Sequence, residues 1–270
     1  MKMIGQCNTA EIYAFEEKKI LKLFRHGIPR ELAVDEYEKA LYIQSCIENV
    51  PKANEFSVYD DRYGIVYEKI AGKDMIRVML QSILKINHYS RMLAHTHLEI
   101  HKTKLKPEQN FTVKERLKGN ITAVEALDET KKKLLLDYLA ELPDGDSLCH
   151  FDYHPGNIMF QDKEPIVIDW MTAGVGDPCA DVARTCLLLS YGVLPNSGFV
   201  VKKLVAIFQR HVGKIYYQEY FRLSNVAEKD VEKWLLPVAA ARLSEWIPEG
   251  EKEALLAIID QWLKKILEAV

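Results

Sequence analysis

Residues 148–160 read LCHFDYHPGNIMF, and this stretch holds most of the chemistry in the sequence. His150, Asp152 and Asn157 follow the spacing H-x-D-x-x-x-x-N, and Asp169 closes the next pair of apolar runs. Phosphoryl transfer to a hydroxyl requires a carboxylate beside that hydroxyl and oxygen ligands for magnesium. The spacing therefore predicts Asp152 as the acceptor-side carboxylate and Asn157 and Asp169 as magnesium ligands.

The local pattern around this stretch predicts a β-hairpin. The apolar runs NIMF and IVID are joined by the polar turn QDKEP, and the turn Pro155-Gly156 lets the chain reverse before them. Such a hairpin would carry Asp169 back beside Asn157. Taken singly, an aspartate before a turn or an asparagine opening a strand is more often a backbone cap than a catalyst. The ordered set favours phosphoryl transfer.

Composition narrows the class of protein. The 270 residues are 48% hydrophobic and 28% charged, which is typical of a soluble globular protein. The net charge of −3 gives no positive field for a nucleic acid, so we expect none as a partner. Five cysteines without a C-x-x-C pair argue against a disulfide framework and a zinc site. No apolar stretch is long enough to span a membrane, and we expect a cytoplasmic protein without membrane association.

Hydrophobic periodicity divides the chain into two parts. Alternating runs predict strands at 11–15, 19–24, 55–61 and 63–70, with one helix at 31–47. From Met75 onward the helical pattern dominates, beginning with 75–102. We therefore predict an α+β fold with two lobes: residues 1–70 form a small antiparallel β lobe with one helix, and residues 71–270 form a larger, mostly α lobe.

Several of these segments resemble the aminoglycoside phosphotransferase and choline kinase group, which are small-molecule kinases with a protein-kinase-like fold. HFDYHPGNIMF at 150–160 resembles the catalytic loop of that family. IVIDWMTAGVGDPCADVART at 166–185 resembles its metal-binding segment and the Gly-Asp-Pro…Asp signature that follows. Weaker similarities keep the same order: GQCNTAEIYAF as nucleotide loop, KILKLF as the strand with the ATP lysine, VPKANEF after the helix, and VYEKIAG as hinge.

The resemblance assigns roles to single residues. It makes Asp152 the catalytic base, Asn157 and Asp169 the magnesium ligands, Lys22 the phosphate-binding lysine and Glu36 its ion-pair partner. Strand alternation agrees for the lysine, because its two leucine neighbours face the other side and a lone inward lysine needs an anion. Glu36 is predicted rather than Glu31 or Glu38 because it shares a helical face with Ala40 and Ile43. A solvated glutamate at this position is the alternative.

The resemblance also implies a nucleotide site and supporting residues. The hinge should offer backbone groups to adenine, at Glu68 and Ile70 among others. Asn8 and Thr9 could donate side-chain hydrogen bonds where a glycine-rich loop is lacking, although a plain hairpin turn explains this segment equally well. The supporting residues are His150, which orients the loop, Asp181, which anchors its backbone, and Asp177, a turn cap.

An acceptor pocket is expected near the C-terminal helices. Glu245 and Trp246 fall where related kinases build this pocket, and an acidic-aromatic pair suits a cationic amine or a sugar. We add Trp170 and Tyr153, the latter either packing or narrowing the site. The predicted activity is transfer of the γ-phosphoryl group of ATP or GTP, with Mg²⁺, to a hydroxyl of a small polar acceptor. A protein Ser/Thr kinase and a catalytically silent nucleotide-binding module are the alternatives, and the oligomeric state stays open.

A second cluster in the sequence suggests a metal. His97 and His101 in HTHLEIH stand one helical turn apart, a spacing that could bind a transition metal. Glu99 is the nearest third ligand, but it falls on another face of the predicted helix. We therefore favour an ordinary packed or surface helix.

Overall fold

The computed structural model describes residues 1–7, 9–107, 111–191 and 198–268. The chain forms two compact units. Unit 1 comprises Met1–Gln81 with Pro155–Thr172, and unit 2 comprises Ser82–His154 with Ala173–Val270. The border between them falls within the stretch quoted above, after His154.

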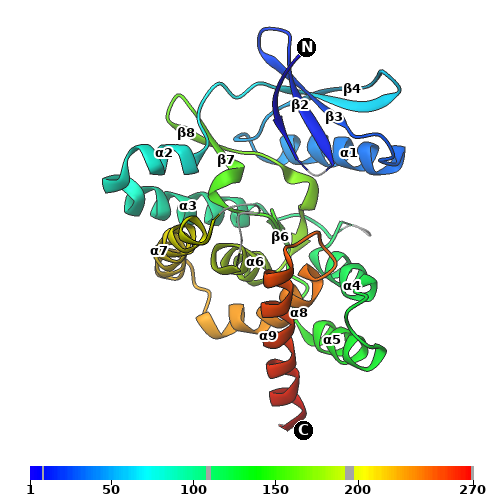
Figure 1. Cartoon of the computed structure of the whole chain (residues 1–270), viewed down its shortest axis with the longest axis vertical. Helices are drawn as coiled ribbons and strands as arrows, with labels where there is room; N and C mark the ends of the chain where they lie inside the picture. The colour runs from blue at the N-terminus through cyan, green and yellow to red at the C-terminus, as the bar shows by residue number, and fades with distance from the viewer. Residues whose placement is uncertain (8, 108–110, 192–197, 269–270) are drawn as a thin grey trace. The chain divides into compact units, whose positions relative to one another are not determined.

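Unit 1 is built on a five-stranded antiparallel sheet (Figure 1). Its strands have the order β1-β2-β3-β5-β4. Their bounds are Lys2–Gln6 for β1, Ala10–Phe15 for β2, Lys19–Phe24 for β3, Ala53–Tyr59 for β4 and Arg62–Glu68 for β5. Asp60 and Asp61 both have positive φ in the tight turn between β4 and β5, a conformation that aspartate tolerates better than most residues.

Helix α1 (Arg30–Cys46) lies against one face of this sheet (Figure 1). Phe24, Ile65 and Ala33 belong to the apolar cluster on that face, whereas Leu21 and Val66 belong to the cluster on the opposite face. The two clusters follow from strand alternation, because neighbouring side chains point to opposite faces. Lys22 thus faces the α1 side, since its neighbours Leu21 and Leu23 face the other.

The rest of unit 1 is a hairpin flanked by short helical turns. Strands β7 (Ile158–Gln161) and β8 (Glu164–Val167) pair antiparallel, as predicted. The 3₁₀ turn η2 (Pro155–Asn157) precedes the hairpin and η3 (Trp170–Thr172) follows it. Helix α2 (Met75–Gln81) contacts η2 and β7, and the Phe160 amide donates to the Lys73 carbonyl.

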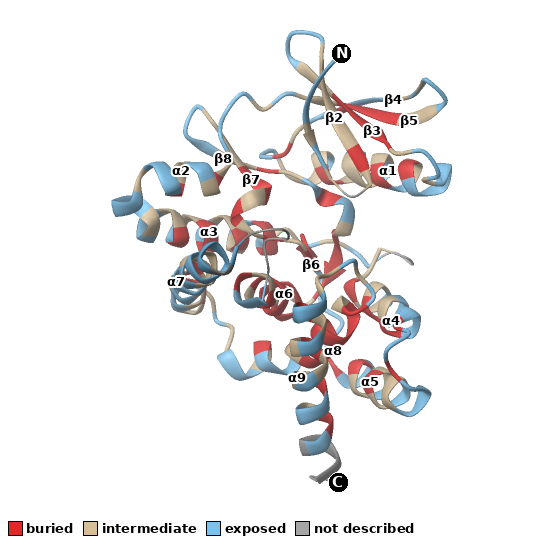
Figure 2. Cartoon of the chain, in the orientation of Figure 1, coloured by how far each residue is buried: buried red, intermediate tan, exposed pale blue. Residues whose placement is uncertain are grey.

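Unit 2 is mostly helical. Its helices are α3 (Ile86–Lys102), α4 (Val113–Ala123), α5 (Glu129–Glu141), α6 (Pro178–Tyr191), α7 (Phe199–Leu223), α8 (Glu228–Arg242) and α9 (Glu249–Glu268). Figure 2 shows α6 and α8 as the most completely buried helices, and both contact several neighbours. A short pair of strands, β6 (Ser147–Cys149) and β9 (Gly174–Gly176), brings the segment before His150 beside the segment before α6.

The α+β class is confirmed. The structure differs from the sequence-based expectations at three places. Strand β1 was not predicted, because residues 2–6 lack clear alternation. Strands β6 and β9 were missed because three residues give no period. The helix predicted over 75–102 is interrupted at Ser82, which has an extended φ of −140° and is followed by the 3₁₀ turn η1 (Ile83–Lys85). No glycine or proline marks that break, so the sequence pattern runs through it.

Among the helices of the described residues, none combines the length and the apolar composition needed to cross a lipid bilayer.

Gly145 provides a test of the packing that leads into β6. Its φ is +74°, and a Cβ atom there would lie 2.3 Å from the Asp177 amide nitrogen and from the Gly176 carbonyl carbon. Backbone atoms cannot move aside cheaply, so Gly145→Ala should lower the free energy of unfolding by about 2–5 kcal/mol in urea titrations.

The matched control is Gly119→Ala inside α4, where a Cβ atom would meet nothing within 4 Å. It should leave stability unchanged or raise it by about 0.5–1 kcal/mol through helix propensity. Equal unfolding midpoints for Gly145→Ala and the wild type would contradict the geometry.

Candidate active site

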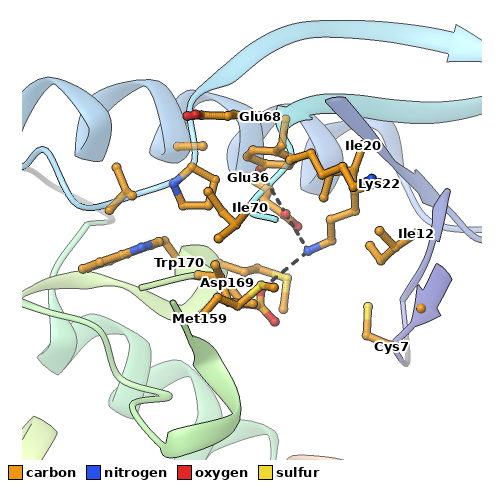
Figure 3. A pocket seen from close by; sticks show the side chains of 18 of the residues that line it. Cys7, Ile12, Ile20, Lys22, Glu36, Glu68, Ile70, Met159, Asp169 and Trp170 are labelled. Carbon is orange, nitrogen blue, oxygen red and sulfur yellow. Dashed lines mark hydrogen bonds and ion pairs between the residues drawn. The ribbon is translucent and has the colours of Figure 1, made fainter. Parts of the chain in front are cut away.

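Lys22 is a buried cation held by carboxylates in unit 1. It lies on β3 between Ile12 of β2 and Ile65 of β5. Its Nζ donates to Oε1 of Glu36 on α1 at 2.6 Å and lies 3.5 Å from Oδ1 of Asp169 (Figure 3). Burial disfavours the charge, but the charge of Glu36, then that of Asp169, outweighs burial and raises the pKa of Lys22 above its ordinary value. The side chain therefore remains an ammonium ion.

Glu36 is the carboxylate that the structure places against Lys22. Glu31 and Glu38 of the same helix are exposed, whereas Glu36 is buried. The Tyr67 hydroxyl lies 3.4 Å from Oε1 of Glu36, and burial together with that carboxylate raises the Tyr67 pKa well above its usual range. In the part of the chain that the structure describes, Oε2 of Glu36 makes no hydrogen bond. A buried carboxylate oxygen without a donor is costly, and this oxygen of Glu36 can still accept a hydrogen bond.

A cavity of about 350 Å³ opens beside Lys22 (Figure 3). Glu68 and Ile70 of the predicted hinge line it, and so does Trp170, whose indole N–H donates to the Val167 carbonyl at 2.9 Å. The further apolar lining residues are Ile4, Ile12, Ile20, Ala40, Ile43, Val50, Pro51, Met159, Ile168 and Met171. A largely apolar cavity with the Lys22 ammonium at its edge suits a flat ring that carries an anionic group.

Of the two residues predicted to bind nucleotide from the first loop, the structure describes one. Asn8 lies outside the described residues. The Thr9 hydroxyl lies 3.7 Å from the Cys7 sulfur, and the Thr9 carbonyl accepts from the Arg25 amide. Cys7 itself lines the cavity. The described part of this loop thus offers side chains of small, weakly polar residues rather than a glycine-rich turn.

The hairpin β7–β8 brings the two predicted magnesium ligands to one end of unit 1. The Ile168 amide donates to the Asn157 carbonyl at 2.9 Å, so Asp169 is the next residue after the one paired with Asn157. Asp169 has a φ of +63°, which turns the chain immediately after the strand. An amide oxygen and a carboxylate are the oxygen donors that Mg²⁺ prefers, so this donor set fits the ion.

Asp181 on α6 holds the backbone of the predicted catalytic loop in unit 2. Its carboxylate accepts from the His150 amide at 2.5 Å and from the Phe151 amide at 2.9 Å. Burial alone would raise the pKa of Asp181, but His97 and His101 outweigh it and hold the pKa well below its usual range. Phe151 has a φ of +61°, which is unfavourable for a phenylalanine. The hydrogen bond from its amide to Asp181 helps to stabilise that conformation.

Asp152 follows this anchored turn and is partly exposed. Its amide donates to Nδ1 of His150 at 3.2 Å, so His150 contacts the loop through its ring. Oδ1 of Asp152 lies 3.9 Å from Nη2 of Arg184, and Oδ2 lies 3.7 Å from Nε2 of His154. A partly exposed carboxylate with the Arg184 guanidinium on one side and the His154 imidazole on the other can orient a hydroxyl and accept its proton.

Arg184 is the residue that sequence reasoning missed. It is buried on α6, and its Nη2 also lies 2.8 Å from Oε2 of Glu245. A signal was present, since Arg184 stands three residues after Asp181 and must share its helix face. Arg242 binds the same Glu245 oxygen at 2.5 Å and reaches Glu251 on α9 at 2.9 Å. Opposite charges therefore alternate from Asp152 to the C-terminal helices.

The remaining predicted residues divide into packing and exposed positions. Tyr153 is fully buried; its hydroxyl donates to the Leu93 carbonyl at 2.8 Å, and its ring stacks on His97. Tyr153 was expected either to pack or to narrow the acceptor site, and these contacts are those of a packed residue. Trp246 is 94% exposed. Asp177 accepts from the Cys179 amide at 2.8 Å and so caps the first turn of α6.

Comparison with known proteins identifies the family. Residues 8–200 match the model of the phosphotransferase enzyme family (APH), which is more than half of the chain. The chain belongs to this family. No curated protein shows a significant match to it. The prediction of a phosphotransferase is therefore confirmed at the level of the family.

Solved structures similar to this phosphotransferase share its fold. An aminoglycoside-3′-phosphotransferase of type VIII has 17% identity and a TM-score of 0.57, over 86% of this chain and 88% of its own. The streptomycin–ATP–APH(2″)-IIa ternary complex has 15% identity and a TM-score of 0.57, over 96% and 90%. Choline kinase from Cryptosporidium parvum Iowa II has 12% identity and a TM-score of 0.56, over 99% and 90%. The protein-kinase-like fold is thus confirmed.

The buried imidazole of His97 should make stability depend on pH. Burial, and next the neighbouring His101, lower the His97 pKa from 6.5 to about 3, while Asp181 opposes the shift. Between these values the unfolded chain binds a proton that the folded chain does not, so stability rises with pH. The free energy of unfolding of the wild type should fall on acidification from about pH 6.5, and His97→Gln should flatten that slope.

Urea titrations between about pH 4 and about pH 7 measure the slope. His211→Gln is the matched control, because His211 is exposed on α7 and bonds Asn87. Its slope should equal that of the wild type. A wild-type slope in His97→Gln would show that His97 is not the group responsible.

Proposed function

We propose that this phosphotransferase is a small-molecule kinase that moves the γ-phosphoryl group of ATP or GTP to a hydroxyl of a small polar acceptor. The observation that carries the proposal is the buried Lys22 ammonium, held by Glu36 and Asp169 at the edge of an apolar cavity. A structural ion pair does not need a cavity beside it, whereas a nucleotide needs both a slot for its base and a cation for its phosphates.

The residues of unit 1 would bind the nucleotide. Lys22 would hold phosphate oxygens, and its position would be fixed by Glu36. The cavity would take the base, with Glu68 and Ile70 offering backbone groups and Trp170 an aromatic wall. This assigns Trp170 to the nucleotide site rather than to the acceptor pocket. The ATP bound in the APH(2″)-IIa complex supports the choice of nucleotide.

Asn157 and Asp169 would hold Mg²⁺ through an amide oxygen and a carboxylate oxygen. When bound, the ion would offset the negative charge of the phosphate groups. Asp152 would orient the acceptor hydroxyl and take its proton as the oxygen attacks the γ-phosphorus. The bond between that phosphorus and the bridging oxygen would break, and the nucleoside diphosphate would leave with the electron pair.

The acceptor is proposed as a cationic or sugar-like alcohol. Support comes from the names of similar structures, which include aminoglycoside phosphotransferases and a choline kinase. One contact narrows how a cation could bind: Glu245 already pairs with Arg184 and Arg242, so an amine would reach it only in competition with both. A screen of amino sugars, choline-like amines, thio-sugars and amino alcohols by ATP consumption would identify the acceptor.

Nucleotide binding should depend on Lys22 and Asp169. In the wild type, MgATP at a hundred times its Kd should stabilise the fold by about 2.7 kcal/mol, which is a shift of several degrees in Tm. Lys22→Met and Asp169→Ala should abolish most of that shift in differential scanning fluorimetry, because the phosphates lose their cation or their metal site.

Lys19→Met is the control, since Lys19 lies on the same strand but pairs with Glu16 at the surface. It should retain the full shift. If the wild type shows no shift with ATP or GTP and Asp169→Ala changes nothing, the proposed function fails.

Catalysis should depend on Asp152 while binding does not. Asp152→Asn keeps the size of the side chain but removes the proton acceptor, so kcat should fall by about 10²–10⁴-fold with an unchanged nucleotide-dependent Tm shift.

Asp162→Asn in the β7–β8 turn is a matched control and should keep wild-type turnover. A catalytically silent nucleotide-binding module would show no turnover to lose. Transfer of labelled phosphate to a protein extract, but to no small molecule, would instead favour a protein kinase.

A further inference from the structure

Two tyrosine–histidine pairs meet at Asp181. His97 and His101 stand one turn apart on α3, and Tyr216 and Tyr220 stand one turn apart on α7. Nδ1 of His97 lies 2.7 Å from the Tyr216 hydroxyl, and Nδ1 of His101 lies 2.7 Å from the Tyr220 hydroxyl. All five side chains are buried. The i, i+4 spacing on both helices places the two pairs side by side.

The other ring nitrogens of both histidines face one carboxylate oxygen. Nε2 of His101 is hydrogen-bonded to Oδ2 of Asp181 at 3.3 Å. Nε2 of His97 lies 3.1 Å from the same oxygen, although off the direction of a well-formed hydrogen bond. The His97 ring is further fixed by Tyr153, which stacks on it at 3.9 Å between ring centroids.

The direction of each proton follows from what the groups can donate. An ionised carboxylate only accepts, so Nε2 of His101, which is hydrogen-bonded to Asp181, must carry hydrogen. Hydrogen on Nε2 of His97 is the form that suits its 3.1 Å approach to the same oxygen. In a neutral imidazole the other nitrogen then accepts, and each tyrosine hydroxyl donates to it. Burial keeps His97 neutral, with a pKa near 3, and burial raises the pKa of both tyrosines, so the hydroxyls keep their protons. One hydrogen-bonded chain therefore runs from Tyr220 through His101 to Asp181, and a second pair runs from Tyr216 to His97, whose Nε2 faces the same carboxylate oxygen.

A metal ion is the competing reading of the same atoms. His97, His101 and Asp181 offer ligand atoms within 4.8 Å of one another, and Asp181 is the third ligand that the sequence did not show. An ion would require both Nε2 atoms without hydrogen and a fourth ligand. Among the described residues this group has three members. Hydrogen bonding among the same side chains requires neither a metal ion nor a fourth ligand.

We propose that the two tyrosine–histidine pairs are positioning residues for phosphoryl transfer. They fix the Asp181 carboxylate, which holds the His150 and Phe151 amides and so the turn that ends in Asp152. The positive φ of Phe151 is unfavourable and persists only while its surroundings hold it. Loss of a donor at Asp181 lets this turn relax and displaces Asp152. The kinetic part of this inference rests on the proposed function.

The first test removes hydroxyls without changing volume. Tyr216→Phe, Tyr220→Phe and the double variant are assayed with MgATP and the acceptor found by the screen, or with water as acceptor if none is found. The double variant should lose about tenfold in kcat, because small displacements of a reacting group are costly, with an unchanged KM for ATP. The KM for ATP should not change because neither tyrosine lines the proposed nucleotide cavity of unit 1.

Tyr138→Phe is the matched control. The Tyr138 hydroxyl also donates within unit 2, to the Lys233 carbonyl at 3.0 Å, but does not contact Asp181. It should keep wild-type kcat, because its hydroxyl is remote from Asp181. A folded double variant with wild-type kcat, or a rise in the KM for ATP alone, would overturn the proposal.

The second test does not depend on activity. Long-range ¹H–¹⁵N spectra of the histidine-labelled protein report which ring nitrogen carries hydrogen, with His97 and His101 assigned by substitution. Both should carry it on Nε2. Hydrogen on Nδ1, or one equivalent of metal by elemental analysis that is lost in His101→Gln, would overturn the hydrogen-bonded chains alone. Absence of turnover in the wild type would instead sink the proposed function, and the positioning role with it.

Discussion

A carboxylate removed from water must be satisfied by donors from the protein, and Asp181 shows how much of unit 2 serves that requirement. The His150 and Phe151 amides of the predicted catalytic loop bind it on one side, and two imidazoles approach it on the other. The helices α3, α6 and α7 therefore have to pack in one register, because a shift of one turn would leave the charge unpaired. The conformation of residues 150–151 depends on that packing through the two amide bonds to Asp181.

Unit 1 contains a buried cation instead of a buried anion. Lys22 is held by Glu36 at 2.6 Å and by Asp169 at 3.5 Å, one from a helix and one from the end of a hairpin. A buried pair of this kind adds little net stability, because desolvation offsets the attraction. The pair lies next to a largely apolar cavity, and one Glu36 oxygen is without a donor in the described residues, which agrees with the proposed nucleotide site.

The charges around Asp152 bear on how an acceptor would be recognised. Glu245 was expected to attract a cation, yet it is shared by Arg184 and Arg242. The same arginine that neutralises Glu245 also faces Asp152 at 3.9 Å. A group that displaced Glu245 would therefore change the surroundings of the proposed base. Glu245 and Asp152 share this one guanidinium group, so the charge that faces Asp152 depends on what pairs with Arg184.

Local pattern in the sequence determined the β7–β8 hairpin, the strand that carries Lys22, and the spacing of Asp152, Asn157 and Asp169, because each depends on residues close together in the chain. It could not determine partners brought together by packing. Lys22 and Glu36 are 14 residues apart, Arg184 and Glu245 are 61 apart, and His101 and Asp181 are 80 apart. Periodicity shows which face of a helix is buried but not which helix covers it. The tertiary structure alone decided that His97 and His101 meet a carboxylate, and that Glu245 is already paired.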